Sequence, residues 1–91
     1  MPNEGEALIL ATAGDNLRES MRLYLQARSK RRQNDSTWRV DLRNSASLRV
    51  EAHNLDPKHE SPAWEEEQGH TPRGRDTHEE IMAFYREQGV L

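Results

Sequence analysis

The sequence predicts a small α+β protein of two layers, in which a β-α-β-β core is followed by a long loop and a C-terminal helix. Three observations support this. The large aliphatic residues concentrate in 1–55 and 77–91, two segments alternate between apolar and charged residues, and 15–32 follows the period of a helix. At 91 residues, the chain has room for one domain with a thin core. We therefore divide a single domain into a core over 1–55, a loop over 56–76 and a helix over 77–91.

The first predicted element is a strand over residues 6–13. This run is almost continuously apolar and lies between Gly5 and Gly14, which is typical of a buried strand. A short helix can have the same composition. The alternative interpretation joins 6–32 into one long helix, in which Gly14 would cost about 1 kcal/mol relative to alanine. We prefer the strand.

Residues 15–32 predict an amphipathic helix. Four apolar side chains share one face: Leu17, Met21, Tyr24 and Leu25. Asn16 and Glu19 have the spacing of a capping box at its start. Basic residues crowd the last turn, where the helix dipole favours cations.

Two alternating segments predict an antiparallel β-hairpin over 38–53. One face of the hairpin is apolar and comprises Trp38, Val40, Leu42, Leu48, Val50 and Ala52. The other face is charged, and the polar residues 44–47 between the segments are typical of a turn. We expect the apolar face to pack on the preceding helix and the charged face to contact water.

The C-terminal part divides into a loop and a helix. Residues 56–76 hold several prolines and glycines and no large aliphatic residue, so they cannot bury enough surface to offset their ordering entropy. Thr77 and Glu80 have capping-box spacing, and Gly89 is a natural C-cap for the helix that follows. A helix of this length is unstable alone in water and is expected to dock on the core, on a second copy or on a partner.

Composition excludes several classes of protein. The chain has no cysteine, which excludes disulfide scaffolds and thiolate metal sites. No apolar run approaches the roughly 20 residues that span a membrane, and the run over 7–13 lacks the basic start of a secretory signal. We therefore expect a cytoplasmic protein that does not contact membranes.

The sequence carries no recognisable catalytic motif, and we interpret the protein as a non-enzyme. The four histidines, His53, His59, His70 and His78, raise the question of a metal site. His53 and His59 are six residues apart and His70 and His78 eight apart, across predicted loop, which matches no familiar ligand spacing. We therefore expect scattered surface histidines, with no metal and no cofactor.

The acidic part of the chain predicts a protein partner. Residues 51–91 hold ten acidic against four basic residues, and Trp64 stands directly before Glu65, Glu66 and Glu67. An aromatic anchor among acids is typical of segments that order on binding. The alternative is that Trp64 folds back to complete the thin core. The leading hypothesis is a small protein-binding module with a regulatory or inhibitory role, comparable to bacterial or phage accessory factors, and able to form a homodimer.

The alternative function is nucleic-acid binding. Residues 1–50 hold nine basic against six acidic residues, which gives this half a local charge of +3. Phosphate contacts would come from the first helix end and the hairpin. The candidate residues are Arg28, Lys30, Arg31, Arg32, Arg39, Arg43 and Arg49.

Overall fold

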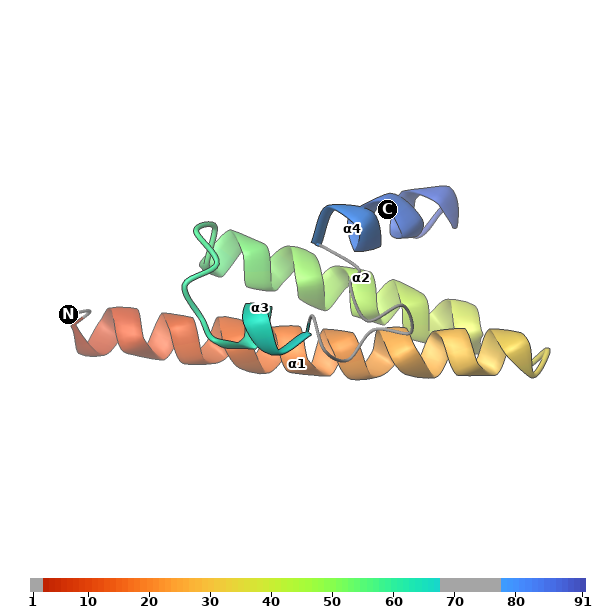
Figure 1. Cartoon of the computed structure of the whole chain (residues 1–91), viewed down its shortest axis with the longest axis horizontal. Helices are drawn as coiled ribbons and strands as arrows, with labels where there is room; N and C mark the ends of the chain where they lie inside the picture. The colour runs from red at the N-terminus through yellow and green to blue at the C-terminus, as the bar shows by residue number, and fades with distance from the viewer. Residues whose placement is uncertain (1–2, 68–77) are drawn as a thin grey trace.

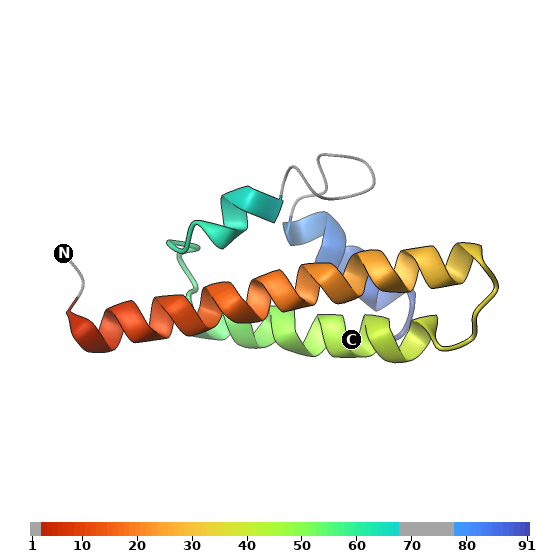
Figure 2. The same ribbon diagram turned by 90° about the horizontal axis from the view of Figure 1, so that it is seen from below.

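The computed structural model describes residues 3–67 and 78–91, and the regular structure within these ranges is entirely helical. The helices are α1 (Glu4–Arg32), α2 (Trp38–Leu55), α3 (Ala63–Glu66) and α4 (His78–Glu87). Figures 1 and 2 show α1 and α2 running antiparallel side by side, with α3 against α1 and α4 against α2. The predicted α+β fold with a β-α-β-β core is therefore wrong. The domain is a helical hairpin that carries two shorter helices.

Helix α1 begins at Glu4, which makes the predicted strand over 6–13 wrong and the long-helix alternative right. The side chain of Asn3 accepts a hydrogen bond from the Glu6 backbone N–H at 2.8 Å, and the acidic residues of the first turn favour the positive end of the dipole. One buried stripe runs along the helix at spacings of three and four residues: Ala13, Leu17, Ser20, Tyr24 and Ala27. The helical prediction for 15–32 is confirmed as the second part of α1, but the predicted start with a capping box at Asn16 and Glu19 is wrong, because the helix continues through these residues from its N-cap at Asn3.

Gly14 lies inside α1 at the point where Ser61 and Ala63 pack against the helix. A Cβ atom built on Gly14 would lie 2.7 Å from Ser61 Oγ and 3.7 Å from Ala63 Cβ. The first distance is well below normal contact, so residue 14 must lack a side chain for Ser61 to pack at this depth. The glycine that suggested a break between two elements is instead a contact point between α1 and a later segment.

Replacing Gly14 by alanine is expected to destabilise the protein by about 1 kcal/mol. The gain in helix propensity is about 1 kcal/mol, but forcing a methyl group against Ser61 costs about 1–3 kcal/mol. Urea unfolding followed by circular dichroism measures the difference. Gly5→Ala is the matched control, because its Cβ would meet only the Asn3 side chain at 3.4 Å, and it should not destabilise. Ser61→Ala should restore part of the loss in the Gly14→Ala background, and a Gly14→Ala protein more stable than wild type would contradict this account.

Helix α2 replaces the predicted β-hairpin over 38–53. Its buried residues recur at helical spacing and include small and charged side chains: Asp41, Leu42, Ser45, Ala46, Arg49 and Ala52. Val40, which the hairpin would have buried, is 60% exposed. The alternation that indicated strands appears only when the large apolar residues are considered alone. Serine, alanine and a buried arginine complete the helical stripe.

Small residues let α1 and α2 approach closely. Ser20 Oγ donates to the Ser45 carbonyl at 2.7 Å, and Ser45 Oγ lies 2.6 Å from the Ser20 carbonyl oxygen. Both serines are fully buried, and Ser45 Oγ also lies 2.7 Å from the Tyr85 hydroxyl of α4. These buried hydroxyl groups therefore have hydrogen-bond partners, and they join three helices at one point.

The predicted C-terminal helix is confirmed as α4, and it docks on its own core. Ile81 and Tyr85 are fully buried, and Tyr24 of α1 meets the rings of Phe84 and Tyr85 edge-on, with ring centroids 5.9 and 6.2 Å apart. Gly89 follows the helix with φ +73°, as expected of a C-cap glycine. The capping residue Thr77 lies outside the described residues.

The predicted loop over 56–76 is described only as far as residue 67. Its first part contains turns and the short helix α3, and residues 68–77 lie outside the described ranges. The Asp56 carboxylate organises this part: it accepts from the backbone N–H groups of Glu60 and Ser61 at 2.8 and 2.9 Å, and from Trp64 Nε1 at 2.9 Å. In the part of the chain that the structure describes, no helix has both the length and the apolar character needed to cross a membrane.

Candidate functional site

Figure 1 shows that the first turns of α1 extend beyond the end of α2. These turns carry exposed apolar side chains. Leu8 is 69% exposed and Ile9 is 46% exposed. Both are large aliphatic residues in a chain whose mean hydropathy is −1.09. Isolated exposed apolar residues are common on protein surfaces, but two adjacent ones next to a pocket form a candidate contact surface.

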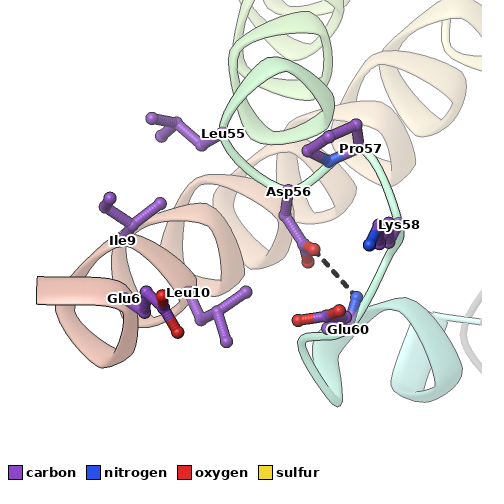
Figure 3. A pocket seen from close by; sticks show the side chains of 8 residues that line it. All are labelled: Glu6, Ile9, Leu10, Leu55, Asp56, Pro57, Lys58 and Glu60. Carbon is purple, nitrogen blue, oxygen red and sulfur yellow. Dashed lines mark hydrogen bonds between the residues drawn. The ribbon is translucent and has the colours of Figure 1, made fainter. Parts of the chain in front are cut away.

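That pocket, which we call the N-terminal groove, lies between α1 and the chain that leaves α2 (Figure 3). Its volume is about 390 Å³. Apolar side chains on both sides line it: Ile9 and Leu10 from α1, and Leu55 and Pro57 from the end of α2 and just beyond. The hydrogen bond from the Glu60 backbone N–H to Asp56 holds the second side in place.

The rim of the N-terminal groove is mainly acidic. Glu6, Asp56 and Glu60 contribute three carboxylates, and Lys58 contributes one ammonium group. Glu6 and Glu60 are exposed, whereas Asp56 is buried. Burial acts to raise the pKa of the Asp56 carboxyl group, but the hydrogen bonds from Ser61, Glu60 and Trp64 outweigh this and hold that pKa below its usual value. The groove therefore joins an apolar floor to negative charge at its edges.

The residues predicted to bind a protein partner are mostly engaged within the chain. Trp64 is 5% exposed and belongs to a core cluster with Leu17, which is the folded-back alternative raised by the sequence. Glu67 is buried and forms an ion pair with Arg49, and Glu66 accepts from Arg18 at 2.9 Å. Glu65 is exposed. These contacts hold α3 against the rest of the chain. A role of residues 64–67 in binding a partner stays a prediction.

The residues predicted to bind nucleic acid are not all free at the surface. Arg49 is fully buried, and Lys30 forms an ion pair with Asp41 at 2.8 Å. Arg28 donates to the Tyr24 hydroxyl at 3.0 Å. Four members of the set are exposed, and the prediction now depends on them: Arg31, Arg32, Arg39 and Arg43.

Three of the four histidines come together in a cluster that the sequence spacing did not indicate. His53 lies in the last turn of α2, His59 lies in the turns before α3, and His78 begins α4. One nitrogen atom of each ring lies within 4.8 Å of the others. His70 lies outside the described residues. The expectation of scattered histidines is therefore corrected for the histidine cluster, His53, His59 and His78.

Neither the exposed start of α1 nor the histidine cluster was found from the sequence. The buried stripe of α1, continued backwards from Ala13 by four residues, reaches Ile9 and excludes Leu8. The long-helix alternative therefore contained a signal for the exposed start of α1. The histidines had no such signal. Their meeting depends on how α4 and the turns after α2 fold back onto the helical hairpin.

Comparison of the chain with protein family models, with curated proteins and with solved structures found no match in any of the three. The fold and the two candidate sites therefore carry the functional argument.

Proposed function

We propose that this protein is a non-enzymatic protein-binding module whose N-terminal groove takes up an amphipathic helix of a partner protein, with lysine or arginine on the polar face of that helix. The exposure of Leu8 and Ile9 beside the groove carries the proposal. A regulatory or inhibitory role in the cytoplasm belongs to the same proposal and comes from the sequence. The proposal assigns no partner contact to Trp64, which is buried in the core.

The shape of the N-terminal groove and its exposed apolar side chains favour an apolar ligand face. The groove lies between the first turns of one helix and the end of another, an arrangement in which an amphipathic helix inserts its apolar side chains. Ile9 lines the groove and Leu8 stands next to it on α1, so one partner helix can cover both. Covering one such side chain completely contributes about 1.5–3 kcal/mol.

The charge of the rim selects the partner. Exposed Glu6 and Glu60 lie on opposite sides of the groove, and Glu4 adds a carboxylate in the first turn of α1. A helix with basic residues flanking its apolar stripe complements these groups, whereas an acidic one is repelled. Because the carboxylates are exposed, added salt should weaken this part of the interaction.

The test uses a synthetic helix of leucine and lysine, about 14 residues or four turns long, with all lysines on one face. Fluorescence anisotropy of the labelled peptide measures its affinity for the full chain. Leu8→Ser/Ile9→Ser is expected to weaken binding at least about tenfold, since two apolar contacts are lost. Val40→Ser is the matched control, because Val40 is an equally exposed aliphatic residue on α2 and its replacement should leave the affinity unchanged.

Two further results bear on the proposal. Replacing the lysines of the peptide by glutamate should weaken binding, and Glu6→Lys/Glu60→Lys should reverse that preference. Equal binding by wild type and Leu8→Ser/Ile9→Ser would overturn the proposal. Light scattering that shows a wild-type dimer and a monomeric Leu8→Ser/Ile9→Ser variant would also overturn it, because a second copy would then occupy the groove.

A further inference from the structure

We propose that the histidine cluster binds a divalent transition-metal ion, with zinc as the best match, through one imidazole nitrogen each of His53, His59 and His78. The proposal goes beyond the protein-binding function and does not depend on it, because the cluster and the N-terminal groove share no residue. Three imidazoles with a fourth position left for water or a carboxylate form a common zinc donor set.

The geometry of the cluster is close to that of a bound site. Tetrahedral zinc with nitrogen ligands at 2.0–2.1 Å places those nitrogens about 3.3 Å apart. His53 Nδ1 lies 2.8 Å from His59 Nε2, and the candidate ligand atoms of all three rings lie within 4.8 Å of one another. Side-chain rotations that move these nitrogen atoms by about an ångström are enough to bring them to the spacing that zinc requires.

The surroundings of His59 and His78 disfavour the protonated form of both rings. Burial, together with the positive charge of Arg49, lowers the pKa of His78 to about 4, and burial and the neighbouring His53 lower the pKa of His59. Neutral imidazoles offer a lone pair without first losing a proton. In the His53–His59 hydrogen bond one nitrogen carries the shared proton, and a metal ion would take the place of that proton after a change of tautomer.

The surroundings hold His59 in position. Its backbone has φ +54°, in the left-handed region, which histidine adopts more readily than most residues other than glycine. The His59 ring stacks on the Trp64 indole with ring centroids 3.6 Å apart and planes 4° from parallel. Trp64 in turn donates to Asp56. This is the kind of outer support that orients metal-binding histidines.

Arg49 competes with the metal ion for His78. Its Nη1 lies 3.1 Å from His78 Nδ1, so one lone pair of that ring is already used. A bound ion would displace this contact and leave Arg49 with Glu67, which already neutralises it. The competition costs affinity, and we therefore expect a dissociation constant in the micromolar range, about 1–10 µM.

A metal ion at this position would join three separate parts of the chain: the end of α2, the turns before α3 and the start of α4. Helix α4 has only ten residues and depends on docking for its stability. An ion that binds the folded form and not the unfolded one raises the melting temperature in proportion to the logarithm of its concentration.

The experiment uses the full chain without an affinity tag, freed of metal by a chelator. Calorimetric titration with Zn²⁺ should give one site per chain, saturating zinc should raise Tm by about 5 °C or more, and Co²⁺ should produce the visible absorption of a tetrahedral complex. His53→Gln, His59→Gln and His78→Gln should each weaken Zn²⁺ binding at least about tenfold. Asn54→Gln, which changes the exposed neighbour of His53, is the matched control and should bind as wild type does.

Circular dichroism of each metal-free variant shows whether it has folded, so that lost binding can be separated from lost structure. If one histidine variant does not fold, the other two still test the site. Absence of saturable Zn²⁺ binding below about 100 µM would overturn the proposal. Binding that survives all three histidine variants but disappears with His70→Gln would overturn it as well, because the ion would then be held elsewhere.

Discussion

Replacing Glu67 by glutamine is expected to lower the free energy of unfolding by about 3–5 kcal/mol. Glu67 is buried and pairs with Arg49, which is fully buried beneath α3 and α4. Burial acts to lower the pKa of Arg49, but the hydrogen bonds and charge of Glu67 outweigh this and leave it raised. The glutamine amide cannot neutralise the guanidinium, whose Nε atom already has no hydrogen-bond partner among the described residues.

Urea unfolding followed by circular dichroism measures this loss. Glu66→Gln is the matched control, because it removes the neighbouring carboxylate, whose ion pair with Arg18 is about half exposed, and it should leave the urea midpoint nearly unchanged. Arg49→Met/Glu67→Leu should recover most of the stability, since an apolar pair of similar volume needs no compensating charge. A Glu67→Gln protein as stable as the Glu66→Gln control would show that the buried pair is not formed.

Replacing Asp56 by asparagine is expected to cost about 2–4 kcal/mol, the second largest effect. The Asp56 carboxylate accepts from two backbone N–H groups and from Trp64 Nε1. Asparagine keeps a single acceptor oxygen and turns an NH₂ group toward at least one of these donors. The turns that carry His59 and α3 should loosen as a result, because no other side chain takes over these bonds in the described part of the chain.

Unfolding curves followed by both circular dichroism and tryptophan fluorescence test this expectation, since Trp64 reports directly on the loosened turns. Asp35→Asn is the control, because Asp35 also accepts from a backbone N–H and a hydroxyl, both from Thr37, but in the exposed turn between α1 and α2. Its effect should be small. Unchanged stability and fluorescence in Asp56→Asn would contradict the role assigned to the carboxylate.

The positions where the sequence misled share one physical cause, which is the size of the residues at the interface between α1 and α2. Large apolar side chains dominate periodicity arguments, and over 38–53 they alternate as in a strand. The interface also contains the small residues Ser20, Ser45 and Ala46, which let the two helices approach closely. Gly14 suggested a break for a related reason. Its missing side chain makes room for Ser61, which is distant in sequence.

The sequence by itself determined the helical character of 15–32, the C-terminal helix with Gly89 after it, and the lack of any cysteine chemistry, because these depend on local periodicity, a C-cap glycine and composition. Tertiary structure alone decided that 6–13 and 38–53 are helical, that Trp64 is buried, and that His53, His59 and His78 meet. Burial of serine, alanine and a paired arginine is favourable only against a partner helix at close range. Convergence of side chains from distant segments is a property of the packed chain and has no counterpart in local sequence.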